Sequence, residues 1–312
     1  MHSSADLRQN GVYMQAYTGF AEVYEEFMDN IPYGEWAEYL TGLLKEYGVN
    51  EGIVCELGCG TGSMTRLLRD KGYDMIGIDN SPEMLDVARE HEQTGFFDTD
   101  FEEESSEYLQ NKEQPSKSVL YLMQDMREFE LYGTAAAFVS VCDSINYITD
   151  YDELTEVFRL VNNYLDKDGV FIFDLKTEHY FRDVLGDTTI AENRKNCSFI
   201  WENSYFEDKK MNQYEITIYK KAYFDDCEYS DENVECREYQ ETDNAEDLYT
   251  RTNEIHTQRA YSLEEIVKAL SDAGMEYIAA YNAFTREPAD STSERIYVIA
   301  KEKYQKNKKY NS

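Results

Sequence analysis

The chain has 312 residues, of which 42% are hydrophobic and only four are proline, so it can bury a sizeable core. Thirty Lys and Arg stand against 63 Asp and Glu, which gives a formal net charge of -33. A surface this negative repels phosphate backbones and anionic lipid headgroups, so nucleic acid and membranes are excluded as default partners. No run approaches the ~20 apolar residues of a membrane helix, and residues 1–10 hold no signal-peptide core. We therefore expect a cytoplasmic protein.

Short apolar runs alternate with segments of helical period in both ends of the chain, which is the pattern of a parallel sheet with crossover helices. The expected strands are 53–57, 75–79, 119–123, 136–142, 170–175, 276–281 and 295–300. One expected helix carries its apolar face on Leu154, Val157, Phe158, Val161 and Leu165. Another begins at a capping box of Ser262 and Glu265 and ends at Gly274. The sequence predicts a doubly wound, Rossmann-like α/β sheet of seven strands with an antiparallel pair at one edge.

Residues 187–261 lack this alternation of strands and helices. Three of their segments are instead rich in the strand-favouring residues Tyr, Ile, Thr and Phe: 198–206, 213–224 and 249–261. We interpret this segment as an antiparallel β insertion that interrupts a core of residues 1–186 and 262–302. The acidic stretches 98–113 and 225–247 are expected to be solvated loops, and the Lys-rich tail 303–312 a frayed end. The six cysteines form no CxxC pair and are too sparse for a disulfide scaffold, so we expect free thiols and no metal site.

A glycine-rich turn follows the first expected strand and carries most of the chemical information. Gly58, Gly60 and Gly62 alternate with other residues, Glu56 precedes the first glycine by two positions, and Asp79 ends the next strand. Glycines let a ligand approach the backbone closely, and an acid at the end of the second strand can accept both hydroxyls of a ribose. The turn therefore predicts a nucleoside-containing cofactor.

Two cofactors fit such a turn. A dinucleotide fingerprint would need glycine at position 63, where Ser63 stands. Glu56 would also repel a pyrophosphate, whereas it would attract the ammonium of a methionine moiety. The charges favour S-adenosylmethionine over NAD, and an NAD-dependent oxidoreductase remains the less favoured alternative.

Four motifs in chain order resemble those of the class I S-adenosylmethionine-dependent methyltransferases, specifically the small-molecule type with a β insertion after the fifth strand. These motifs span Glu56 to Gly62, Gly77 to Leu85, Gln124 to Arg127 and Cys142 to Tyr147. The resemblance covers nearly the whole chain. It implies that residues 1–50 form a helical lid over the cofactor and that the insertion 187–261 covers the acceptor pocket.

The resemblance also implies roles for individual residues. Glu56 would face the amino end of S-adenosylmethionine, Asp79 would bind the ribose, and Asp125 would accept the adenine amine. The methionine part would be wrapped by Gly58, Cys59, Gly60, Thr61 and Gly62. Asn80 and Met84 would flank the adenine, and Met126 would offer its backbone amide to the ring. Cys142 and Asp143 would lie under the sulfonium, and Tyr17 and Trp36 would cover the cofactor from the lid.

The expected reaction is methyl transfer to N or O of a small-molecule acceptor. The fourth motif lacks the Asn-Pro-Pro-Tyr pattern of enzymes that methylate adenine or glutamine amides. Proton removal from the acceptor has several candidate bases, among which the sequence does not choose: His179, His256, Asp143, Tyr24 and Tyr147. A non-catalytic module that binds S-adenosylmethionine or S-adenosylhomocysteine is an alternative, and the sequence leaves monomer or homodimer open.

Overall fold

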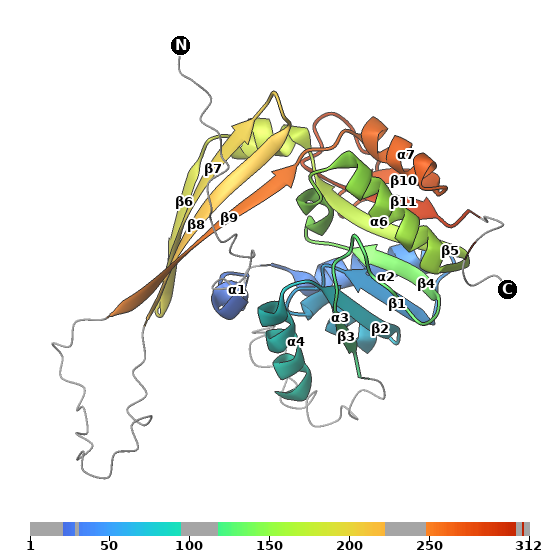
Figure 1. Cartoon of the computed structure of the whole chain (residues 1–312), viewed down its shortest axis with the longest axis horizontal. Helices are drawn as coiled ribbons and strands as arrows, with labels where there is room; N and C mark the ends of the chain where they lie inside the picture. The colour runs from blue at the N-terminus through green and yellow to red at the C-terminus, as the bar shows by residue number, and fades with distance from the viewer. Residues whose placement is uncertain (1–20, 29–30, 95–117, 222–247, 304–307, 309–312) are drawn as a thin grey trace, which may run out of the picture.

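Seven strands form one mixed sheet, which lies on the right in Figure 1. The computed structural model describes residues 21–28, 31–94, 118–221, 248–303 and 308. The strand order is β10-β11-β5-β4-β1-β2-β3, and only β11 runs antiparallel to its neighbours. The strands are β1 (Ile53–Leu57), β2 (Asp74–Asp79), β3 (Leu120–Met123), β4 (Ala135–Ser140), β5 (Leu165–Lys176), β10 (Glu276–Asn282) and β11 (Arg295–Lys301). The predicted doubly wound sheet is confirmed.

Helices cover both faces of this sheet. They are α2 (Tyr33–Glu46), α3 (Ser63–Asp70), α4 (Pro82–Thr94), α6 (Tyr151–Tyr164) and α7 (Leu263–Asp272). Val170 and Ile172 of β5 pack in one buried cluster with α2 and α3, whereas Phe171 and Phe173 pack in another with α6 and α7. This alternation follows from the two-residue period of a strand that is buried on both faces. The α2 helix, which lies in the segment expected to form a lid, packs on this sheet through residues that include Ala37, Leu40 and Leu44.

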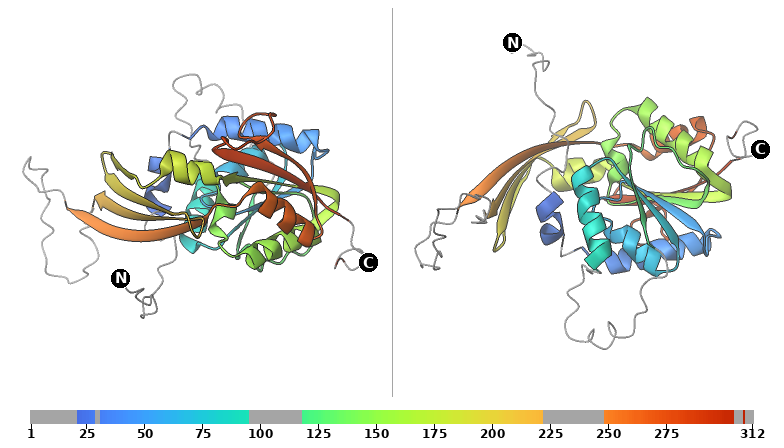
Figure 2. Two further views of the ribbon diagram at one scale, coloured as in Figure 1. Left: turned by 90° about the horizontal axis from the view of Figure 1, so that it is seen from above. Right: turned by 60° about the horizontal axis from the view of Figure 1, so that its bottom comes forward.

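A second sheet of four antiparallel strands projects from this core (Figure 2). Its strands are β6 (Thr189–Asn193), β7 (Cys197–Phe206), β8 (Met211–Lys221) and β9 (Tyr249–Arg259), in that order. The predicted insertion thus has one strand more than the sequence indicated. The α1 helix (Ala21–Phe27) packs on it through Val23 and Phe27, and the Phe27 ring lies 4.6 Å from that of Phe199, centroid to centroid.

Several element ends differ from the sequence expectations. Leu165 begins β5 rather than ending the preceding helix, and β4 ends at Ser140 because Cys142 and Asp143 take positive φ angles of 59° and 57°. The capping box at Ser262 is present as predicted. Lys308, expected in a frayed tail, forms an ion pair with Glu302 and both side chains are buried.

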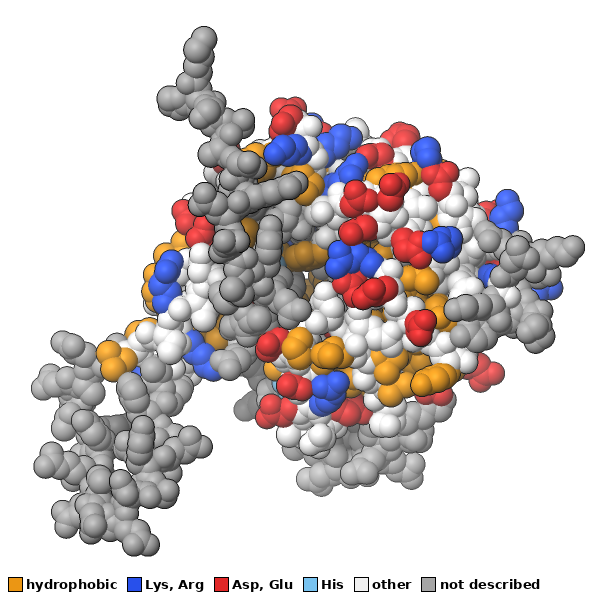
Figure 3. Space-filling model, in the orientation of Figure 1, with side chains coloured by type: hydrophobic (Ala, Val, Ile, Leu, Met, Phe, Trp, Pro, Cys, Tyr) orange, Lys and Arg blue, Asp and Glu red, His pale blue; other side chains and the backbone are white. Residues whose placement is uncertain are grey.

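Other expectations fall partly or wholly outside the described residues. The acidic stretches 98–113 and 225–247, which include Cys227 and Cys236 in the second, lie there. Cys55, Cys59, Cys142 and Cys197 are free thiols. No helix in the described ranges is long and apolar enough to cross a bilayer. On the face in Figure 3, acidic side chains of the core lie beside basic ones rather than forming one negative patch.

Candidate functional site

A cavity of about 290 Å³ opens at the carboxyl ends of β1, β2, β3 and β4. This position includes the gap between β1 and β4, where the chain order of the sheet reverses, and open α/β sheets bind their ligands there. The residues that line the cavity are Tyr24, Tyr33, Glu56, Gly58, Cys59, Gly60, Thr61, Ser63, Met64, Ile78, Asp79, Asn80, Ser81, Met84, Gln124, Asp125, Met126, Arg127, Val141, Cys142, Ser144, Tyr147 and Ile148.

Most of the predicted cofactor residues line this cavity. They are Glu56, Gly58, Cys59, Gly60, Thr61, Asp79, Asn80, Met84, Asp125, Met126 and Cys142. Gly62 is the N-cap residue of α3 and is not among the lining residues. Trp36 is not among the lining residues and stacks on Phe284, with ring centroids 5.0 Å apart. Tyr17 lies outside the described residues.

The glycine turn is held by backbone hydrogen bonds. The N–H groups of Gly58 and Cys59 both donate to the carbonyl of Ile78, at 2.8 and 3.0 Å. Gly58 has φ +71°, and a Cβ there would lie 2.6 Å from Ser144 Oγ, so this position requires glycine. Gly60 also has positive φ, +52°, but a Cβ there would meet nothing within 4 Å. The turn is therefore packed at its base and open beside the cavity.

Asp79 ties the end of β2 to this turn. Its two carboxylate oxygens accept hydrogen bonds from the backbone N–H of Gly60, at 2.8 Å, and of Ser81, at 2.9 Å. Each carboxylate oxygen can accept a second hydrogen bond, so the side chain can still receive ligand hydroxyls. Burial raises the pKa of Asp79, and these backbone donors oppose that shift.

Glu56 is a buried carboxyl group on the wall of the cavity. Its side chain is 2% exposed and accepts a hydrogen bond from the Thr65 hydroxyl. Burial raises the pKa of Glu56 to about 8, although the Thr65 hydrogen bond opposes the shift. Such a group gains most from a cationic ligand, since a nearby positive charge stabilises the carboxylate that burial destabilises.

Asp125 also lines the cavity and is held by Arg127. The guanidinium donates to both carboxylate oxygens, with Nε at 2.9 Å and Nη2 at 2.6 Å, and the Arg127 N–H donates at 2.8 Å. Burial would raise the pKa of Asp125, but Arg127 holds it below the ordinary value. The sequence reasoning missed this pairing, although the i, i+2 spacing of an acid and an arginine was visible.

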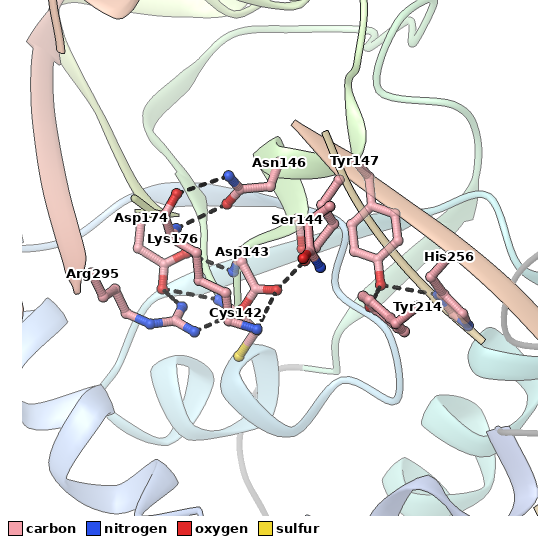
Figure 4. A network of polar contacts seen from close by, with 12 residues as sticks. Cys142, Asp143, Ser144, Asn146, Tyr147, Asp174, Lys176, Tyr214, His256 and Arg295 are labelled. Carbon is pink, nitrogen blue, oxygen red and sulfur yellow. Dashed lines mark hydrogen bonds and ion pairs between the residues drawn. The ribbon is translucent and has the colours of Figure 1, made fainter. Parts of the chain in front are cut away.

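The turn after β4 depends on a buried ion-pair network that includes Asp143 (Figure 4). Asp174 of β5 accepts from the N–H groups of Cys142, at 3.2 Å, and Asp143, at 2.7 Å. Arg295 donates to both Asp174 and Asp143, and Lys176 pairs with Asp143 at 3.2 Å. Burial alone would raise the pKa of Asp143, but the charges of Lys176 and Arg295 hold it below its ordinary value. Asp143, predicted to lie under the sulfonium, supports the turn and does not line the cavity.

The thiols at the cavity are weak nucleophiles in this setting. Burial raises the pKa of both Cys59 and Cys142 well above the ordinary value, and nearby carboxylates raise it further. A thiol nucleophile needs a lowered pKa, so both cysteines remain protonated at neutral pH.

The candidate bases separate into two groups. Tyr24 and Tyr147 line the cavity, and the Tyr147 hydroxyl lies 3.0 Å from His256 Nδ1. His179 instead pairs with Asp183, at 2.9 Å, and is not among the lining residues. Sequence reasoning did not connect Tyr147 with His256, which lies 109 residues further along the chain.

Comparisons with known proteins agree with this geometry. Residues 24–280 match the family described as "Methyltransferase domain". YqeM of Bacillus subtilis (strain 168), provisionally named a methyltransferase, is 29% identical over 285 residues, which are 91% of this chain and 96% of YqeM.

Solved structures share the fold. The crystal structure of an S-adenosylmethionine-dependent methyltransferase from Clostridium acetobutylicum ATCC 824 has a TM-score of 0.69 at 22% identity, over 92% of this chain and 99% of that one. CalS10, an amino pentose methyltransferase from Micromonospora echinaspora with S-adenosylmethionine bound, has a TM-score of 0.59 at 13% identity, over 95% and 100% of the two chains. The chain has the fold of S-adenosylmethionine-dependent methyltransferases and belongs to the methyltransferase domain family.

Proposed function

We propose that this methyltransferase transfers the methyl group of S-adenosylmethionine to N or O of a small-molecule acceptor. One observation carries the proposal: Glu56, the glycine turn, Asp79 and Asp125 come from the ends of three parallel strands and line one cavity.

The lining fits the chemistry of this cofactor along its length. Glu56 offers a buried carboxylate to the ammonium of the methionine part, and the open side of Gly60 leaves room for a ligand against the backbone. Asp79 is placed to receive the two ribose hydroxyls. Met84 and Met126 supply apolar walls for the adenine beside Asp125. The pyrophosphate of NAD would lie next to the Glu56 carboxyl group, and the described lining near Glu56 holds no cation to offset the repulsion. NAD therefore fits the cavity less well than S-adenosylmethionine.

S-adenosylmethionine, when bound, supplies an activated methyl group, so the protein gains rate mainly by alignment and water exclusion. The Cys142–Asp143 turn is rigid because Asp174 accepts from both of its N–H groups, and Cys142 of this turn lines the cavity. The aromatic rings of Tyr24, Tyr33 and Tyr147 line the same space and would limit the water that reaches an acceptor there.

A transfer assay tests the proposal. The protein, freed of copurified ligand, is incubated with S-[methyl-³H]adenosylmethionine and a panel of amino sugars, amines and phenols, with transfer RNA and a protein mixture in parallel. We expect label in one class of small molecule. Label in the RNA or protein would contradict the acceptor class, and tight cofactor binding without transfer to any member would favour a non-catalytic binding module.

A further inference from the structure

Tyr147 connects the cavity to a buried row of polar side chains (Figure 4). It ends the short helix η1 (Ser144–Tyr147) and lines the cavity. Its hydroxyl lies 3.0 Å from His256 Nδ1 and also bonds the Tyr214 hydroxyl. On the far side of the imidazole ring, Nε2 lies 3.2 Å from a carboxylate oxygen of Glu254.

The row is fixed by the insertion sheet. Glu254 and His256 are two residues apart on β9, so they share a face of that strand, and they are only 3% and 1% exposed. The His256 ring stacks on Tyr214 of β8, with centroids 4.9 Å apart and planes at 9°. Tyr214 in turn stacks on Trp201 of β7 at 4.2 Å. Three strands therefore hold the imidazole edge-on to Tyr147.

We propose that Tyr147, His256 and Glu254 form a proton relay that removes the proton of the methyl acceptor; this inference rests on the proposed function. The acceptor lone pair forms the new bond to the methyl carbon, and the carbon–sulfur bond breaks with its electron pair staying on sulfur. The acceptor proton passes to Tyr147 Oη, and the Tyr147 hydroxyl proton passes to His256 Nδ1. The positive charge lost at sulfur is thereby regained on the imidazolium, next to the Glu254 carboxylate.

The relay requires one tautomer of His256. Its Nδ1 must carry the lone pair that faces Tyr147, and its Nε2 must carry the proton that is donated to Glu254. A carboxylate on one ring nitrogen fixes this arrangement and stabilises the imidazolium that forms. Among the described residues, the titratable groups that face His256 are Tyr147 from η1, Tyr214 from β8 and Glu254 from β9 itself.

Nitrogen NMR of the full-length protein tests this requirement without an identified acceptor. The chain has four histidines, so ¹⁵N-histidine labelling with a His256→Gln variant assigns the ring. At pH 7.5 we expect a neutral ring protonated on Nε2, and loss of that preference in Glu254→Gln. A ring protonated on Nδ1, or doubly protonated, would overturn the relay, because neither can accept a proton from Tyr147.

Kinetics separates a relay from a structural cluster. With any acceptor found in the panel, Tyr147→Phe and His256→Gln should each slow transfer by about 10²- to 10⁴-fold, while S-adenosylhomocysteine affinity in His256→Gln stays at the wild-type value. In the wild type, the rate should fall in parallel with the NMR-observed protonation of His256. His179→Gln is the matched control and should keep the full rate. Equal rates in all these folded variants would overturn the relay but leave the proposed function intact, whereas loss of cofactor binding by the wild type would contradict the proposed function itself.

Discussion

The buried carboxyl group of Glu56 makes a quantitative prediction about cofactor binding. Burial raises its pKa to about 8, so at neutral pH the ligand-free protein holds it largely protonated. Ionising it at pH 6, about two units lower, costs about 2.7 kcal/mol, since one pH unit corresponds to about 1.4 kcal/mol. Only the ionised form pairs with the ammonium of S-adenosylmethionine. Affinity should therefore rise about tenfold per pH unit from about pH 6 to 8, and binding should release a proton.

Isothermal titration at pH 6, 7 and 8 measures this effect. The amine of the ligand also titrates over this range. Its ionisation is the same with either protein and therefore cancels in the ratio of the wild-type affinity to the Glu56→Gln affinity, which is the quantity to compare. The ratio should increase with pH and level off near the pKa of about 8. Glu90→Gln, an exposed position on α4, should match the wild type at every pH. A ratio that is constant across the range would refute the pairing of Glu56 with the ammonium.

The same pKa predicts how folding stability depends on pH. The pKa of Glu56 is higher in the folded than in the unfolded protein, so its contribution favours the fold below about pH 4.5 and is lost as pH rises through about 8. Glu56→Gln cannot ionise. Thermal unfolding of the ligand-free proteins should show the variant more stable than the wild type at pH 8 to 9, and the difference should shrink as the pH falls.

Three further substitutions probe the site and its support. Asp79→Asn should weaken S-adenosylmethionine binding by about 1 to 3 kcal/mol in titration calorimetry, because ligand hydroxyls and a backbone N–H lose an acceptor. Arg295→Leu leaves Asp143 and Asp174 buried without their guanidinium and should cost about 3 to 5 kcal/mol of unfolding free energy in urea denaturation. Gly58→Ala should lower both thermal stability and cofactor affinity, since its Cβ would lie 2.6 Å from Ser144 Oγ at φ +71°.

Matched surface variants give the controls for these substitutions. Asp86 and Arg89 form an exposed ion pair on α4, where Asp86→Asn and Arg89→Leu should each change stability by less than about 1 kcal/mol. Wild-type cofactor affinity in a folded Asp79→Asn protein would contradict the ribose assignment. If Arg295→Leu lowered the free energy of unfolding by no more than Arg89→Leu does, the structural role of the buried ion-pair network would be contradicted.

Local patterns in the sequence predicted most of the core. Strands buried on both faces, such as β5 from Val170 to Phe173, are continuous apolar runs, and the capping box at Ser262 marks a helix start through side-chain chemistry. By contrast, β6 (Thr189–Asn193) is a short and largely exposed edge strand, so it has no apolar run to detect. Leu165 continues the apolar period of α6 but has extended backbone.

The candidate site was predictable where its residues are close in sequence to the strand ends. The ion pair of Asp143 with Arg295 was not predictable, because the two residues are 152 positions apart in the sequence and meet only when β11 pairs with β5. Asp174 offered a signal, since a charged residue inside a buried apolar strand requires a partner. Glu254 and His256 gave the i, i+2 spacing of one strand face, but only the fold brings that face to Tyr147.

We expect the cavity at the carboxyl ends of the strands to bind S-adenosylmethionine. Isothermal titration of the ligand-stripped protein with S-adenosylmethionine, S-adenosylhomocysteine and NAD in parallel tests it most directly. We predict one site per chain for the first two ligands, abolished or weakened in Asp79→Asn, and no binding of NAD. Binding of NAD, or of none of the three, would contradict this expectation.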